Sequence, residues 1–169
     1  YDSYQAKVAE WDHAIAAVLA SLEPAAPETA LPAVRHKGRP AHAPTFNVRA
    51  ALFQLLGMDL PQLHGFGAYT ALMLIGECGV DMTKWPTAKH CTSWLTLAPG
   101  NKISGGKLLS SKTRRSANRA AKRLRLAAVN VGKTQTALGA FYRRLAARVG
   151  KAKAVTATAR KLAVLFYNT

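Results

Sequence analysis

The sequence predicts an all-α protein. Three observations lead to this fold class. Apolar residues recur at spacings of three and four in several stretches, glycines and prolines separate these stretches, and no stretch alternates strongly between apolar and polar residues. Apolar residues make up 49% of the 169 residues, which is enough to build a buried core.

Residues 3–22 are expected to form an amphipathic helix with a coiled-coil-like seam. The seam consists of Val8, Trp11, Ile15, Val18 and Leu22. Such a helix can pair with a second copy or another helix, or it can pack on its own domain. We expect residues 1–22 to be a coiled-coil arm segment and residues 46–169 to be the helical domain.

Residues 23–45 are expected to be a linker, because five prolines forbid a regular helix there. The linker contains a basic cluster. Its members are Arg35, His36, Lys37 and Arg39. A flexible basic segment can order on a phosphate backbone, and a solvated tether is the equal alternative.

Helices are also expected along the domain itself. Thr45 is expected to cap the first helix and Gly57 to end it. Further helices are expected over 68–78, 87–97, 113–131, 135–148 and 152–167, with a glycine- and serine-rich loop over 98–111. One face of the 113–131 helix carries small and apolar residues: Ala117, Ala120, Ala121, Leu124, Ala127, Ala128 and Val131.

The charge is strongly one-sided. Residues 1–30 hold one lysine against five carboxylates, whereas the remainder holds 23 basic residues against three, and no Asp or Glu follows Asp81. A surface of one sign indicates a polyanionic partner, and nucleic acid is the common one. A carboxylate cage for a metal and a Ser–His–Asp triad are both excluded within residues 82–169, so no metal site is expected there.

The remaining composition favours a cytoplasmic, nucleoid-associated location. Two cysteines make no disulfide framework, and the longest apolar stretch is too short to cross a membrane. No histidine lies at metal-ligand spacing from another histidine or a cysteine. Because the chain begins at Tyr1, we expect it to be a fragment of something longer.

Residues 63–71 have the form apolar-x-Gly-apolar-Gly-x-x-x-Ala, which is typical of a helix-hairpin-helix. Gly65 and Gly67 permit a tight turn, and the N–H groups that open the next helix can bind a phosphate. An ordinary helix–helix turn is the alternative.

Residues 101–107 place a serine in a glycine-rich turn. The stretch differs from a Walker loop, because Asn101 replaces its first glycine and Leu108 its hydroxyl residue. Gly105 and Gly106 would let a phosphodiester reach Ser104, and Lys102 and Lys107 would stabilise the negative charge that gathers during an attack. No local motif supplies a general base, so a polar turn serine is the alternative.

Basic residues continue into the long helix. The candidate nucleic-acid contacts there are Lys112, Arg114, Arg115, Asn118, Arg119, Lys122 and Arg123. Arg115, Arg119, Lys122 and Arg123 are expected to share a face away from the alanine stripe, which suits a phosphate backbone.

Several of these residues together resemble one family, the insertion-sequence-110 transposases, in the C-terminal domain. The resemblance is carried by Gly65-Phe66-Gly67, Trp85-Pro86, residues 94–107, residues 118–128, residues 140–145 and residues 157–163. The family is similar to Piv-type DNA invertases and includes bridge-RNA-guided recombinases. The stretch Arg115-Ser116-Ala117-Asn118 departs from the Lys-x-Gly-Asn of many members.

The resemblance implies a function for the chain. The family's nucleophilic serine corresponds to Ser104, which would attack DNA and form a transient phosphoserine link. Magnesium would belong to a RuvC-like domain that precedes a coiled coil and is outside this chain. The implied partners are DNA, a structured guide RNA and a second copy paired through the N-terminal helix, without a membrane. The chain alone should then bind nucleic acid without recombining it. A non-enzymatic helix-hairpin-helix protein that binds nucleic acid is the alternative.

Overall fold

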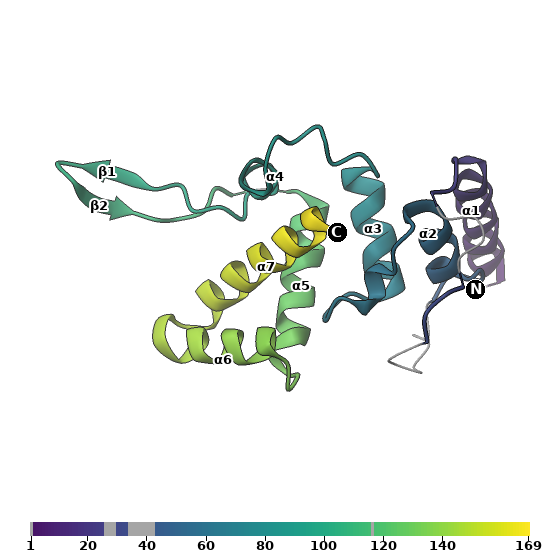
Figure 1. The fold of residues 1–169 in the computed structure, drawn as a ribbon. Helices are drawn as coiled ribbons and strands as arrows, with labels where there is room; N and C mark the ends of the chain where they lie inside the picture. Colours follow the sequence, from purple (N-terminus) through teal and green to yellow (C-terminus); the bar gives the residue numbers. More distant parts are fainter. Residues whose placement is uncertain (1, 26–29, 34–42, 116) are drawn as a thin grey trace. The chain divides into compact units, whose positions relative to one another are not determined.

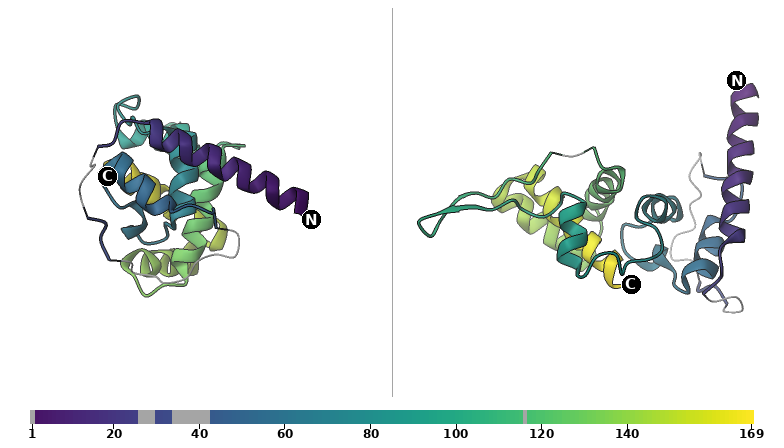
Figure 2. Two further views of the ribbon diagram at one scale, coloured as in Figure 1. Left: turned by 90° about the vertical axis from the view of Figure 1, so that its right-hand side faces the viewer. Right: turned by 90° about the horizontal axis from the view of Figure 1, so that it is seen from above.

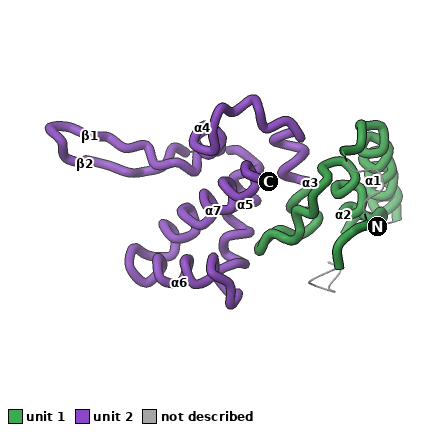
Figure 3. The backbone as a smooth tube through the Cα atoms, viewed as in Figure 1, with its two compact units in different colours: residues 1–72 green, residues 73–169 purple. Residues whose placement is uncertain are grey.

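The computed structural model describes residues 2–25, 30–33, 43–115 and 117–169. The chain divides into two compact units, Tyr1–Leu72 and Met73–Thr169, shown in green and purple in Figure 3. The described residues form seven α-helices, one short 3-10 helix and a single two-stranded sheet, so the predicted helical fold class is confirmed. The predicted segments 1–22, 23–45 and 46–169 stay predictions.

The first unit contains α1 (Asp2–Ser21), α2 (Val48–Leu56), η1 (Leu60–Gln62) and the start of α3 (Ala68–Cys78) (Figure 1). Helix α1 lies against α2. The carboxylate of Asp12, which is only 8% exposed, accepts a hydrogen bond from the backbone N–H of Thr45 at 2.8 Å. Helix α1 confirms the helix predicted over 3–22. The hydrogen bond of Asp12 fixes this helix to the segment that leads into α2.

The residue that caps the N-terminus of α2 differs from the prediction. Asn47, not Thr45, caps the N-terminus of the helix, because its Oδ1 accepts from the N–H of Ala50 at 3.1 Å, while the Thr45 N–H is bonded to Asp12. The predicted end at Gly57 is confirmed by its left-handed φ of 71°. The predicted helix over 68–78 is also confirmed, with the same bounds as α3.

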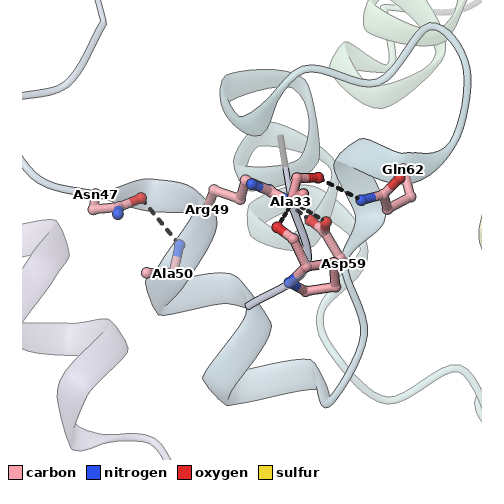
Figure 4. A network of polar contacts seen from close by, with 7 residues as sticks. Ala33, Asn47, Arg49, Ala50, Asp59 and Gln62 are labelled. Atoms are coloured by element: carbon pink, nitrogen blue, oxygen red, sulfur yellow. Dashed lines mark hydrogen bonds and ion pairs between the residues drawn. The ribbon is translucent and has the colours of Figure 1, made fainter. Parts of the chain in front are cut away.

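A buried ion pair joins α2 to the turn that follows it (Figure 4). The guanidinium of Arg49 binds the carboxylate of Asp59, and the two side chains are 12% and 3% exposed. Arg49 also donates to the carbonyl of Pro32 at 2.9 Å, and Gln62 donates to the carbonyl of Ala33 at 3.3 Å. Residues 30–33 are therefore held against α2 and η1 by side-chain hydrogen bonds.

The second unit contains α4 (Ala88–Trp94), β1 (Lys102–Ser104), β2 (Lys107–Ser110), α5 (Arg119–Gly132), α6 (Ala137–Val149) and α7 (Lys151–Asn168). Helix α7 packs against α4, α5 and α6, and the hairpin of β1 and β2 projects beyond these helices (Figures 1 and 2). The Tyr167 hydroxyl donates to the carbonyl of Trp85 at 2.7 Å, which ties the end of α7 to the turn before α4.

The core of this unit relies on small residues that let helices approach closely. The buried positions on α5 and α7 include Ala120, Ala121, Leu124, Ala127, Ala128, Val131, Ala154, Ala159, Leu162 and Ala163. A methyl group on Gly132 would lie 2.5 Å from the Tyr142 ring, so α5 and α6 meet where only glycine fits. The alanine face predicted for the long helix is thus confirmed for the positions inside α5, whereas Ala117 precedes the helix and is exposed.

Three predicted elements of this unit need correction. The helix predicted over 87–97 ends at Trp94, because Thr96 takes a left-handed φ of 57°. The helix predicted from 113 begins at Arg119, because Asn118 caps it by accepting from the N–H of Ala121 at 2.9 Å. The stretch 98–111 contains β1 and β2 and is not simply a loop. The last two helices and their separation at Gly150, with φ 88°, are confirmed.

Within the described parts of the chain, no helix is both long enough and apolar enough to cross a lipid bilayer.

Candidate nucleic-acid interface and serine hairpin

Ser104 lies at the turn of the β-hairpin. Gly105 and Gly106 connect the strands with φ values of 53° and 74°, the two positive angles of a type I′ turn. Methyl groups on these glycines would contact nothing within 4 Å, so the turn stands in open space. Glycine is required here for backbone conformation, and the open surroundings leave room for a bulky substrate beside the serine.

The strand register places Ser104 directly opposite Lys107. Directly paired residues of an antiparallel ladder point to the same face of the sheet, with Cβ atoms about 4.5–5.5 Å apart. The predicted neighbourhood of Ser104 and Lys107 is therefore present. Lys102 pairs with Ser110 at the other end of β1, beyond an irregularity in the register next to Ile103. Lys107 is thus the cross-strand partner of the serine, whereas Lys102 lies two residues away from it on β1 itself.

The hairpin has almost no packing of its own. Every residue from 101 to 109 is exposed, including Ile103, Leu108 and Leu109. In the described part of the chain no hydrogen bond joins the Ser104 hydroxyl to a histidine or a carboxylate. The described structure thus identifies no general base bonded to the serine.

The basic segment before α5 is arranged differently from the prediction. Lys112, Arg114 and Arg115 are exposed in a non-helical segment, so Arg115 does not share a helix face with Arg119. Arg119, Lys122 and Arg123 do belong to α5, and Asn118 serves as its N-cap. The physical reason is the cap: once Asn118 starts the helix, the preceding residues are left outside its hydrogen-bond ladder.

One acidic residue contacts this basic region. Glu77 of α3 lies 3.5 Å from the Nε of Arg119, whose side chain is 76% exposed. Exposed ion pairs of this kind contribute about 0–1 kcal/mol, so a phosphate can displace the carboxylate at little cost. Glu77 and Asp81 are the only carboxylate side chains from residue 73 onward in the sequence, and the Asp81 carboxylate already accepts from Thr83.

The predicted glycine turn lies in the first unit. Gly65 has a φ of 93°, and a methyl group on Gly67 would contact nothing within 4 Å. Phe66 between them is buried, and α3 starts at Ala68. Before the turn, however, stands the short η1 and not a full α-helix, so the helix-hairpin-helix stays a prediction. The other candidate contacts, Arg35, Lys37 and Arg39, lie outside the described residues.

Other possible nucleophiles are held in the core. Cys78 and Cys91 are buried, and burial is the main cause that raises the pKa of Cys78 to about 12 and shifts the pKa of Cys91 in the same direction. Both thiols therefore stay protonated at neutral pH. No cluster of three or more histidine, cysteine or carboxylate side chains able to hold a metal occurs in the portion of the chain that the structure covers.

A second set of cations on α6 and α7 was not among the predicted contacts. Its members are Arg143, Arg144, Arg148, Lys151, Lys153, Arg160 and Lys161. Arg143 has a structural role, because it donates to the carbonyls of Gly132 and Thr134 at 3.1 and 2.7 Å. The signal that could have found the others is the lack of any carboxylate after Asp81, which leaves these helices without acidic partners.

The fold and charges define a basic, helical protein with one exposed hairpin arm. A model of the IS116/IS110/IS902 transposase family matches residues 58–143, just over half of the chain. The chain therefore belongs to this transposase family, which assigns it a transposase-related role in DNA recombination. The match includes the Gly65–Gly67 turn, the serine hairpin and α5. No curated protein and no solved structure matches the chain.

Proposed function

We propose that this chain is the serine-bearing, DNA-binding part of a transposase that exchanges strands through a phosphoserine intermediate. The observation that carries the proposal is the position of Ser104 on an unpacked hairpin turn, opposite Lys107. A serine that served only the fold would have a packing or hydrogen-bonding role. In the described residues, no hydrogen bond of the Ser104 hydroxyl gives it such a role, and its side chain is exposed, as a nucleophile requires.

In the proposed step, the Ser104 Oγ forms a bond to a DNA phosphorus, and the bond from that phosphorus to the leaving strand's oxygen breaks. The hydroxyl proton passes through water to the leaving oxygen. Lys107 would stabilise the negative charge on the phosphoryl oxygens as the new bond forms. The reverse transfer, from serine to another strand's oxygen, completes the exchange without net loss of a phosphodiester bond.

The proposal assigns no magnesium ligand to the residues of this chain. It would be held by the carboxylates of a RuvC-like domain outside residues 1–169, where it would stabilise charge at the reacting phosphate. This chain's contribution is the nucleophile and the cationic surface. By itself the chain then binds DNA and a structured guide RNA but does not recombine DNA.

The decisive experiment uses the protein joined to its RuvC-like domain. With a nicked suicide DNA substrate, Ser104→Ala should abolish the covalent protein–DNA adduct on denaturing gels. DNA binding should fall by only about 1 kcal/mol, the net contribution of one hydrogen bond. Ser111→Ala is the matched control, because it removes an exposed hydroxyl just beyond the same hairpin and should leave the adduct intact.

An adduct that persists in Ser104→Ala would contradict Ser104 as the nucleophile and point to a tyrosine instead. Binding should also weaken steeply with salt, by a log–log slope of about 0.9 per phosphate contact on duplex DNA. A flat response to salt would contradict the cationic interface itself.

The proposed partner of α1 is the same helix of a second copy. Four seam residues of α1 are exposed, Trp11 at 59%. Burying such a side chain contributes roughly 1.5–3 kcal/mol, which favours a paired helix. Light scattering should report dimers for the chain and monomers for the double variant Trp11→Ala, Ile15→Ala. Monomers in both samples would reduce α1 to a self-packed helix.

A further inference from the structure

A groove of about 1220 Å³ lies between the segment that follows β2 and helices α6 and α7. Its lining is mostly apolar and includes Leu97, Leu109, Leu138, Phe141 and Val164. The volume exceeds the range of about 300–1,000 Å³ that is typical of sites for small ligands. An extended ligand therefore suits this groove better than a compact one.

Helix α7 presents one continuous stripe to the groove. Lys153, Ala157, Lys161 and Val164 line it at spacings of three and four residues, and Arg160, beside Lys161, lines it as well. The other face of α7, which includes Ala154, Thr158 and Leu162, is buried in the core. The groove-facing stripe is thus distinct from the residues that hold the unit together.

Four cations surround the apolar lining: Lys112, Lys153, Arg160 and Lys161. Among the described residues no carboxylate lines the groove. Glu77 and Asp81, the only carboxylate side chains in the sequence from residue 73 onward, are bonded to Arg119 and Thr83. The Nζ of Lys161 lies 4.7 Å from the centre of the Phe141 ring, so a cation sits against an aromatic face of the lining. An anionic ligand could therefore bind these cations without displacing a carboxylate of the groove lining.

The position of the groove connects it to the serine. Leu108 and Leu109, which follow Lys107 on β2, belong to the lining. Lys107 is the register partner of Ser104. A strand whose phosphate lies at Ser104 could therefore continue along β2 into the groove.

Two other ligand classes fit less well. Lysine is depleted in the buried centres of protein–protein interfaces, whereas three lysines line this groove. An intact duplex presents its phosphates outward and keeps its bases stacked, so it offers nothing to an apolar lining. A single strand suits both the apolar lining and the cations, because its splayed bases have apolar faces and its backbone carries one negative charge per nucleotide.

We propose that this groove binds a single-stranded nucleic-acid segment next to the serine hairpin. Its bases lie on the apolar lining and its phosphates contact Lys112, Lys153 and Arg160. The proposal rests on the function proposed above and names the strand path beside the same hairpin.

The experiment measures fluorescence anisotropy of the full chain with a labelled oligothymidylate of about 12 nucleotides, within the 4–16 nucleotides that single-strand sites span. A duplex of the same length is titrated in parallel. The groove variant is Lys153→Ala with Arg160→Ala. The matched control is Lys151→Ala with Arg148→Ala, which removes the same two charges from exposed positions outside the groove.

The groove variant should bind the single strand on the order of tenfold more weakly than the control pair, with a salt slope lower by about 1.4. Both pairs should weaken duplex binding equally. Leu109→Asn, at a position 68% exposed, keeps every charge and should weaken single-strand binding alone.

Equal effects of the two pairs on the single strand would overturn the proposal, and this is also the outcome if the groove receives an acidic protein segment. An equal loss on the duplex and the single strand would overturn it as well. The adduct assay separates the two proposals. If Ser104→Ala retains the adduct, or the unaltered protein forms none, while the groove variant still loses the single strand, the proposed chemistry fails and the groove assignment stands.

Discussion

The hairpin and the helical core of the second unit are neighbours in sequence but differ in how far their side chains are buried. On the inner faces of α5 and α7, alanines and leucines such as Ala128, Leu124 and Leu162 are fully buried, so the space available sets which residue fits. In the hairpin, every residue from 101 to 109 is exposed, and only the Gly-Gly turn has a conformational requirement. Substitutions in the core should therefore change the stability of the unit, whereas substitutions in the exposed hairpin should leave the core intact.

Thiol reactivity should separate the two regions most strongly. In a Cys91→Ala background, an added Leu109→Cys thiol should react with iodoacetamide at the rate of a free thiol. Cys78 should react at least about 1,000-fold more slowly, because reaction requires the core to open. The raised pKa of Cys78 acts in the same direction, since the thiolate is scarce below a pKa of about 12.

Mass spectrometry of timed samples gives both rates. Denaturant serves as the control, because it should make the two thiols equally reactive. Fast labelling of Cys78 in the native chain would mean that the core around Cys78 opens far more often than its burial indicates.

A second comparison uses two leucines of one helix. Leu124→Ala should lower the free energy of unfolding by about 2–5 kcal/mol, because the side chain is fully buried and its helix packs against α7. Leu126→Ala is chemically the same change on the same helix at a position that is 57% exposed, and it should alter stability by less than about 0.5 kcal/mol. Urea unfolding followed by circular dichroism measures both, and equal losses would show that the face of α5 is misassigned.

The smallest expected effect concerns the hairpin turn. Gly106→Ala should cost about 1–2 kcal/mol, because an L-residue with a side chain disfavours a φ of 74°. The loss should be confined to the hairpin, seen as faster amide exchange on β1 and β2 with an unchanged thermal midpoint. Gly76→Ala, in a helix with open space around the added methyl group, is the control and should leave the hairpin amides unaltered. A shared fall in the midpoint would couple the hairpin to the core.

The sequence predicted the elements whose ends carry strong local signals. Helix α3 has its predicted bounds because an apolar run is isolated by glycines, and Gly57 and Gly150 stop helices through backbone conformations they adopt readily. The start of α5 was missed because residues 113–117 fit a helical pattern, and only the cap hydrogen bond from Asn118 decides where the ladder begins. The hairpin was missed because three- and four-residue strands are too short to show alternation, although its Gly-Gly pair is itself a turn signal.

The candidate site was predictable only in part. The register that puts Lys107 beside Ser104 follows from a two-residue turn, so it could have been derived once the strands were recognised. The groove could not, because its lining combines residues near 97, 109, 138 and 164, and no local pattern indicates which of them meet.

The two-residue turn also limits how the hairpin can change in length. Exposed connections generally accept insertions, because added residues cost little and disturb nothing. This one cannot, since side chains alternate between faces along each strand and the turn sets which residues are paired. One extra residue between Ser104 and Lys107 would break that pairing, and a one-residue shift of β2 would turn its side chains to the opposite face. An arm that resembles a dispensable loop in its exposure is therefore as intolerant of gaps in an alignment as a buried strand.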